Sequence, residues 1–138
     1  MSPVIEEAVQ ARLVASTPQV EIVPATLHYD REDPFTVRMA FPPPATLEGT
    51  EVTWEFSREL LATGITEPAG AGDVRVRPFG YGRTVMEFHA PEGTAMVHLR
   101  TAELRRFLER VHGLVPAGRE HLYLDLDHDL TELLRDAC

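Results

Sequence analysis

Apolar and polar residues alternate along most of the first hundred positions, which predicts β-strands. The clearest case is the segment 35–41, where Phe35, Val37, Met39 and Phe41 are separated by Thr36, Arg38 and Ala40. A period of two is typical of a strand with one buried face. The pattern predicts seven strands, at residues 10–16, 20–29, 35–41, 52–56, 74–79, 84–90 and 95–100. Because short connections join them, we expect antiparallel pairing, since parallel strands need longer crossovers.

Two of these strands have marked boundaries. Pro24 interrupts the second strand, which fits a sheet edge or a bulge because proline has no N–H to donate. The segment 29–34 (Tyr-Asp-Arg-Glu-Asp-Pro) is a predicted turn, in which Asp30, Asp33 and Pro34 supply local hydrogen bonding and a fixed φ. Trp54 and Phe56 lie on one face of the fourth strand and are expected in the core.

A helix is predicted after the fourth strand and after the seventh strand. Leu104, Phe107, Leu108 and Val111 form one apolar stripe and predict a long helix over 102–112. We expect Thr101 to cap this helix, and Gly113 and Pro116 to end it.

A short helix is expected over 58–63, with Ser57 as its N-cap and Gly64 as a left-handed C-cap. A terminal helix is expected from about Asp127. The fold class is therefore α+β, with antiparallel sheets of about seven strands and one short, one long and one C-terminal helix. The order suggests a doubled sheet-and-helix unit, although the sequence shows no repeat. Since no stretch is typical of a linker, we predict a single domain over 1–138.

Composition excludes most familiar enzyme classes. The sequence contains no Lys, so all 13 basic residues are Arg. It also contains no Asn. A P-loop or a Schiff-base lysine is therefore absent. The single Cys, Cys138, cannot form an intrachain disulfide or a thiolate metal site. None of the three serines lies in a Gly-x-Ser-x-Gly motif. We predict no enzymatic activity and no cofactor.

The formal net charge of −9 argues against a general nucleic-acid binder and against adsorption to an anionic membrane. The first seven residues lack the features of a signal peptide. No apolar stretch approaches the ~20 residues that span a bilayer. We therefore expect a cytoplasmic protein without direct membrane insertion.

Two clusters contain possible metal ligands. Asp125, Asp127, His128 and Asp129 form the densest one, but they lack the spacing of an EF-hand, and capping of the last helix is the favoured interpretation. His89 and His98 lie on adjacent predicted strands without a third ligand. Glu87 beside His89 suggests an acid–base pair, but nothing else completes a mechanism. We predict no metal and no catalytic residue.

Basic and apolar side chains suggest two surfaces. Arg75 and Arg77 share one face of a strand, with Arg83 across the next hairpin. Together with Trp54, Phe79 and Tyr81 they suggest a surface for single-stranded nucleic acid, although a solvated face that pairs with carboxylates is favoured. The Gly80-Tyr81-Gly82 segment is only a turn signal. Val14, Val85 and Met96 lie opposite the predicted core face, which leaves self-association and loose packing within one chain as equal alternatives.

Three segments resemble the SsgA-like family of actinobacterial regulators of sporulation-specific cell division. Residues 27–37 (LHYDREDPFTV) resemble the family pattern L-x-Y-D-x-x-D-P-[YF]-x-V. Residues 52–64 (VTWEFSRELLATG) resemble V-x-W-x-F-x-R-[DE]-L-L-x-x-G, and residues 72–78 (GDVRVRP) resemble G-D-V-R-V-x-P. Shorter matches continue in family order to residue 127.

The resemblance implies a non-catalytic adaptor. SsgB-like members recruit the tubulin-like division GTPase FtsZ and promote its assembly. The resemblance therefore implies that this chain recruits or positions FtsZ at septum sites, directly or through another family member, so FtsZ and other SsgA-like proteins are the expected partners. It also implies a whirly-like fold and a homotrimer located at the division septum. Because whirly proteins bind single-stranded nucleic acid, that activity is the alternative function. The motif residues themselves are interpreted as structural, so the partner-binding residues are unassigned.

Overall fold

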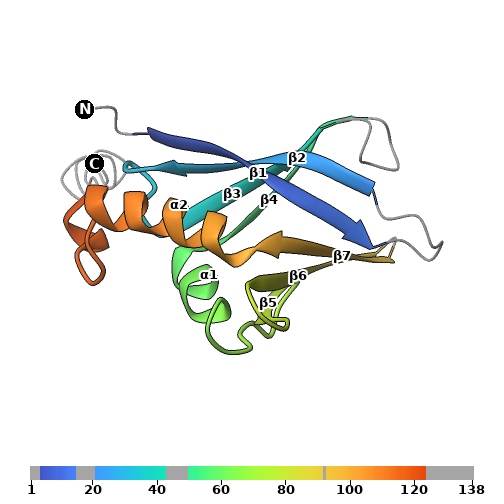
Figure 1. Cartoon of the computed structure of the whole chain (residues 1–138). Coiled ribbons are helices and arrows are strands. Elements are labelled where there is room, and N and C mark those ends of the chain that lie inside the picture. The colour runs from blue at the N-terminus through green and yellow to red at the C-terminus, as the bar shows by residue number, and fades with distance from the viewer. Residues whose placement is uncertain (1–3, 15–20, 43–49, 92, 124–138) are drawn as a thin grey trace.

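All seven predicted strands are present, and they pair antiparallel in one sheet (Figure 1). The computed structural model describes residues 4–14, 21–42, 50–91 and 93–123. The strands are β1 (Val4–Val14), β2 (Glu21–Asp30), β3 (Thr36–Phe41), β4 (Val52–Ser57), β5 (Val74–Pro78), β6 (Arg83–Ala90) and β7 (Gly93–Arg100). Their order in the sheet is β4-β3-β2-β1-β7-β6-β5.

The sheet consists of two meanders joined by one strand pair. β1 to β4 form the first meander, and β5 to β7 form the second. β1 connects them, because it pairs with β2 from Val4 to Leu13 and with β7 from Ala11 to Val14. Helix α1 (Arg58–Gly64) follows the first meander and α2 (Thr101–Leu114) follows the second. Figure 1 shows β1 running from the first meander to the second, where its end lies beside β7.

The core lies on one face of this curved sheet. α2 packs on β1 and β7, and α1 packs between β4 and β5. The apolar stripe of α2 is buried as predicted, including Leu104, Phe107 and Val111. The two ends of the sheet approach each other through Phe88 of β6, whose ring lies 5.6 Å from that of Phe41 and 5.2 Å from that of Trp54. The sheet thus nearly closes around its own apolar side chains.

The strand predictions need two corrections. β1 begins at Val4 rather than near residue 10, because its first half pairs with β2 and buries Ile5. Phe35 lies outside β3 and is 47% exposed, since it belongs to the turn before the strand. Pro24 fits its predicted place at an edge. It pairs with Gln10 of β1, while β3 pairs with β2 only from Thr26 to Tyr29.

The predicted ends of α2 were wrong in part. Arg100, not Thr101, is the N-cap residue, and it makes no side-chain capping bond. Thr101 is the first helical residue, and its buried hydroxyl lies 2.8 Å from that of Thr84. Gly113 does not end the helix, which continues to bury Leu114. A 3-10 helix at Glu120–Tyr123 was not predicted, and the expected terminal helix near Asp127 lies outside the described residues.

Gly64 was also interpreted wrongly. It is the last residue of α1, and its φ is not positive, so it is not a left-handed cap. A Cβ at this position would overlap the side chain of Val76 on β5. Glycine is required here because helix and strand approach closely, which no local pattern reveals. The Ser57 N-cap is confirmed, since its hydroxyl accepts a hydrogen bond from the Leu60 N–H at 2.9 Å.

Candidate functional site

The most distinctive buried polar group belongs to Arg58, the first residue of α1. Only 2% of this residue is exposed. Its guanidinium donates to the carbonyl of Val115 at 2.7 Å and to the hydroxyl of Tyr29 at 3.2 Å. It also forms an ion pair with Glu120, with Nη2 and Oε1 2.6 Å apart. Tyr29 in turn donates to the carbonyl of Pro34 at 2.8 Å. This network joins β2, the following turn, α1 and the segment after α2.

The network shifts the acidity of its members. Burial raises the pKa of the Tyr29 hydroxyl, against the opposing effect of Arg58. A hydrogen bond from its own backbone lowers the pKa of the Glu120 carboxyl, and Arg58 lowers it further. Burial lowers the pKa of His112, and the positive charge of Arg58 adds to that shift. These shifts favour the neutral forms of Tyr29 and His112 and the charged form of Glu120, beside the cationic Arg58.

Two of the segments quoted above meet in this network. Asp30 and Asp33 shape the turn as predicted: the Asp30 carboxylate accepts from the Glu32 N–H at 2.9 Å, and Asp33 N–H donates to the Asp30 carbonyl at 2.9 Å. Arg38 holds Asp33 and Glu55 at 3.0 and 3.1 Å. These residues position the chain.

The opposite face of the sheet carries a cluster of arginines. Strand register places Arg12 opposite His98, His98 opposite Val85, and Val85 opposite Arg77, in one row across β1, β7, β6 and β5. Two further rows flank this row on the same face of the sheet. Arg83 pairs with Arg100 in one of them, and Arg75 pairs with Glu87 in the other. We call this surface the arginine face; its basic members are Arg12, Arg75, Arg77, Arg83 and Arg100.

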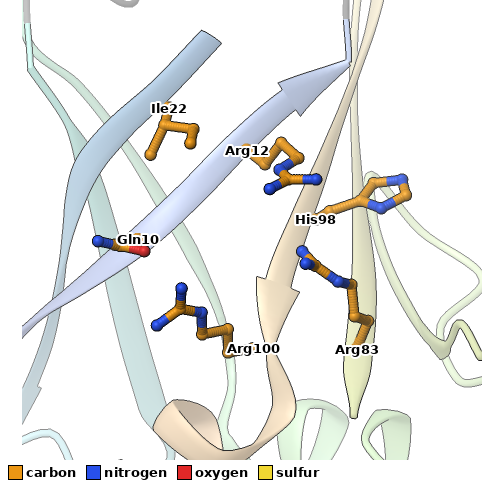
Figure 2. A pocket seen from close by; sticks show the side chains of 6 residues that line it. All are labelled: Gln10, Arg12, Ile22, Arg83, His98 and Arg100. Carbon is orange, nitrogen blue, oxygen red and sulfur yellow. The ribbon is translucent and has the colours of Figure 1, made fainter. Parts of the chain in front are cut away.

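A shallow depression lies within the arginine face (Figure 2). Its walls are formed by Gln10, Arg12, Ile22, Arg83, His98 and Arg100. Figure 2 shows the side chains of Arg12 and Arg83 extending toward each other from β1 and β6, while Arg100 of β7 extends toward Gln10. The pKa of His98 is lowered by burial first and then by the charges of Arg83, Arg12 and Arg77. The depression is thus a site of positive potential on an acidic chain.

Few carboxylates compensate these arginines. Arg77 Nε lies 3.8 Å from Glu87, and Arg100 Nη1 lies 3.9 Å from Glu103, both long for an ion pair. Within the described part of the chain, Arg12, Arg75 and Arg83 have no carboxylate partner within 4.0 Å. The expected pairing of Arg75 and Arg77 with many carboxylates is therefore limited to one long contact.

The structure separates the aromatic residues predicted beside these arginines. Phe79 is on the arginine face, where its ring lies edge-on to His98 at 4.8 Å and under the guanidinium of Arg77 at 5.8 Å. Tyr81 is fully exposed at the hairpin. Trp54 is not part of this surface, since it packs against Phe88 in the core. The prediction that placed all three on one surface was wrong for Trp54.

The apolar residues predicted to lie opposite the core do lie there, with different exposure. Val14 is 43% exposed, Met96 is half-buried, and Val85 is fully buried between Arg77 and His98. Exposed Ile22 adds to this group. The face is therefore mixed, with arginines interspersed among apolar side chains.

The histidines predicted on adjacent strands are not brought together as a metal site. His89 pairs with Thr94 and His98 with Val85, so the two histidines do not face each other. His89 Nε2 lies 4.0 Å from Glu87, while its Nδ1 lies 3.0 Å from the Thr94 hydroxyl. No group of three or more His, Cys, Asp or Glu residues suited to a metal occurs among the described residues. The Asp125–Asp129 cluster lies outside them.

Sequence reasoning missed Arg12 and Arg100 as parts of the surface, and Arg58 and Glu120 as a buried pair. Arg12 alternates with apolar residues along its strand, and this alternation predicts that its side chain points away from the core. Its nearness to Arg83, 71 positions later, depends on the β1–β7 and β6–β7 registers. No local signal marks Arg58 as buried, because arginine is normally exposed.

Comparisons with known proteins agree with the resemblance described above. A profile described as "Streptomyces sporulation and cell division protein, SsgA" matches residues 23–120. The sporulation-specific cell division protein SsgB of Streptomyces coelicolor is 39% identical over 140 residues, covering 99% of this chain and 100% of that protein. SsgB of Kineococcus radiotolerans is 40% identical over 117 residues, covering 81% and 68%.

A solved structure shares the fold. The crystal structure of an SsgA-like sporulation-specific cell division protein from Thermobifida fusca superposes with a TM-score of 0.82 at 34% identity. The superposition covers 95% of this chain and 96% of that one. The similarity therefore extends over both meanders and both helices.

Proposed function

The chain belongs to the SsgA family of sporulation and cell division proteins, and we propose that it is a non-catalytic adaptor in sporulation-specific cell division. In this proposal it recruits or positions FtsZ at septum sites, directly or through another SsgA-like protein. The observation that carries the proposal is the similarity to SsgB along the entire chain. A position at the septum on its cytoplasmic side follows from this role; no helix among the described residues is long and apolar enough to cross a membrane.

Two features support an adaptor rather than an enzyme. The polar residues of the family segments, Tyr29, Asp33 and Arg58, are used to hold the fold together. The depression on the arginine face is lined by three arginines, Gln10, Ile22 and His98, so its one proton acceptor, the imidazole of His98, has no nucleophilic side chain beside it among the lining residues. General acid–base catalysis would need a proton acceptor placed beside a nucleophile or a substrate.

The adaptor is proposed to act as a whirly-like homotrimer. Three copies of one weak surface bind a polymer far more tightly than a single subunit, because the second and third contacts form at a high effective concentration. Such a trimer distinguishes assembled FtsZ from free subunits without a high-affinity pocket. The net charge of −9 also opposes non-specific adsorption to the nucleoid.

Co-sedimentation tests this proposal. The purified chain is centrifuged with FtsZ polymerised in GTP and with unpolymerised FtsZ in GDP, in the presence and absence of a second SsgA-like protein. We expect the chain in the pellet only with polymer, in at least one of the two mixtures. Recovery of the chain in the supernatant of every mixture would refute the adaptor function.

A cellular measurement tests the proposed location. A fluorescent fusion of the chain is expressed in sporulating Streptomyces coelicolor from which SsgB has been removed. We expect regularly spaced bands at division sites. In the control, wild-type SsgB is returned to the same strain and septa form. A diffuse signal of the fusion in cells that form septa in this control would contradict the septal role.

The arginine face favours a second candidate, a module for single-stranded nucleic acid. Arginines and Phe79 lie together there, as such binding requires. A titration with fluorescent oligothymidine at low and moderate salt tests this function. It predicts binding that weakens steeply as salt is added. An unchanged anisotropy at low salt would exclude it.

A further inference from the structure

Three arginines line the depression of the arginine face, and Arg12 and Arg83 extend toward each other there. Of the three, Arg100 has a carboxylate nearby: Glu103 lies 3.9 Å from its Nη1 and accepts a hydrogen bond from the Gln10 N–H. Guanidinium groups of like charge repel each other, and the repulsion grows as the surroundings become less polar. Arg12 and Arg83 are half-buried, and they have no ion-pair partner in the described part of the chain. An anion bound among them would relieve this repulsion.

The shape of the surface distinguishes between kinds of anion. Guanidinium groups bind carboxylates through two parallel hydrogen bonds, and Gln10 adds an amide at the rim. Ile22 is 57% exposed beside this group, and Val14 is 43% exposed at the same end of β1. A ligand that carries both carboxylates and apolar side chains would contact both kinds of residue.

A nucleic acid fits this surface less well. Single-stranded nucleic acid requires open aromatic rings on which bases stack. Phe79 is 48% exposed, but its ring has His98 at its edge and the Arg77 guanidinium above it. The fully exposed Tyr81 lies at the hairpin and does not line the depression, and Trp54 packs against the core. In addition, the net charge of −9 repels a long polyanion, whereas a short acidic segment meets only the local positive field.

We propose that the arginine face is the docking site for an acidic peptide segment of a protein partner, with an Asp or Glu carboxylate of that segment held between Arg12 and Arg83 and with Arg100 adding positive charge beside it. The neighbouring apolar residues Ile22 and Val14 contact the aliphatic side chains of the same segment. The inference rests on the proposed adaptor function, because it names the surface with which the adaptor contacts its partner.

The test uses the purified full chain and a fluorescein-labelled twelve-residue peptide of alternating Glu and Leu. A second peptide with Gln in place of every Glu is the control. We expect saturable binding of the Glu peptide by fluorescence anisotropy and none of the Gln peptide. Absence of binding of the Glu peptide at low salt, or equal binding of both peptides, would overturn the inference.

Two double variants locate the site. R12Q/R83Q removes two positive charges from the depression, and R105Q/R106Q removes two from α2, where both arginines are exposed. We expect the first variant to weaken peptide binding by about tenfold or more and the second by less than twofold. An equal loss in both would show a general effect of net charge and overturn the assignment.

A measurement on the unaltered chain avoids any effect of substitution on folding. The NMR titration of His98 is followed with and without the Glu peptide. A carboxylate beside His98 favours its charged form, so the pKa of His98 should rise when the peptide binds. An unchanged His98 titration at saturating peptide would place the binding elsewhere.

Failure of this inference and failure of the adaptor function give different results. If wild type and R12Q/R83Q co-sediment equally with polymerised FtsZ, the arginine face is not the contact surface and the adaptor function stands. If the peptide binds but nothing co-sediments, the docking site stands and the proposed partner is wrong. Tighter, Arg12-dependent binding of oligothymidine than of the Glu peptide would assign the face to nucleic acid and overturn the inference.

Discussion

Arg58 shows how a single side chain connects distant parts of this chain. Its guanidinium reaches Tyr29, Val115 and Glu120, which lie 29, 57 and 62 positions away. It therefore fixes the start of α1 against β2 and against the end of α2. Buried charges are stable only when they are paired and hydrogen-bonded, as this one is.

Replacement of Arg58 by methionine should destabilise the fold strongly. The change leaves the Val115 carbonyl without its donor and Glu120 without its cation, although Glu120 can still reach water. We expect a loss of roughly 2–4 kcal/mol in the free energy of unfolding measured with urea. Arg119→Gln, at an exposed position, should change it by less than about 0.5 kcal/mol. Similar losses in both variants would mean that the buried network contributes little.

His112 should make stability depend on pH. Its pKa is lowered in the folded chain by burial and by Arg58, from an ordinary value of 6.5. The unfolded chain therefore binds a proton at a higher pH than the folded chain does. Stability is complete above about pH 6.5 and falls as the pH decreases below it. Since the pKa of His98 is lowered too, it contributes in the same direction.

The measurement is the free energy of unfolding at pH 7.5 and at pH 5.5. Wild type should be less stable at the lower pH, and His112→Gln should show a smaller difference between the two. A larger difference in the variant would contradict the assigned direction of the pKa shift.

At the scale of elements, the packing of α1 on β5 depends on a missing side chain. Gly64 lies against Val76, and the space that a Cβ would occupy is already filled. Gly113 of α2 offers the comparison, because it is exposed and nothing lies within 4 Å of an added Cβ. Neither glycine has a positive φ. The two positions therefore differ in packing and not in backbone conformation.

Alanine at these two positions should have opposite effects. Gly64→Ala should destabilise the fold by about 1–3 kcal/mol, because overlap with Val76 exceeds the gain in helix propensity. Gly113→Ala should stabilise it by about 0.5–1 kcal/mol, since only the propensity changes. Thermal and urea unfolding measure both. Val76→Gly removes both side-chain atoms that the new Cβ would overlap; if it fails to lessen the effect of Gly64→Ala, overlap with that side chain is not the cause.

At the scale of the whole molecule, the sheet has two unlike faces. One encloses the core with α1 and α2, and the other carries the arginine face with exposed Ile22 and Val14. Among the described residues, strand pairing joins the two meanders through β1 and β7. The arginine face is formed by the second meander together with the half of β1 that joins it, so it exists only after the two meanders have paired.

The proposed assembly gives a prediction at this scale. Light scattering of the purified chain should give a mass three times 15.4 kDa, because the adaptor is proposed to act as a trimer. Dilution of the sample tests whether the assembly dissociates. A mass of one chain at every concentration would remove the multivalent mechanism, while the adaptor function would then require a single tight contact.

The sequence by itself determined the class of fold and the family. Alternating apolar residues require a sheet with one buried face, and the stripe in α2 requires a helix packed on it, because both periods follow from local backbone geometry. The Ser57 cap and the turn at Asp30–Asp33 are likewise local hydrogen-bonding patterns. These features need no knowledge of what lies nearby in space.

Only the tertiary structure decided the rest. Which strands are neighbours, and in which register, places Arg12 beside Arg83 and removes Trp54 from that surface. Burial of Arg58 and the need for glycine at position 64 arise from segments that meet after folding. The physical reason is that charge repulsion, packing overlap and hydrogen bonding depend on distance in space, and a sequence specifies distance only along the chain.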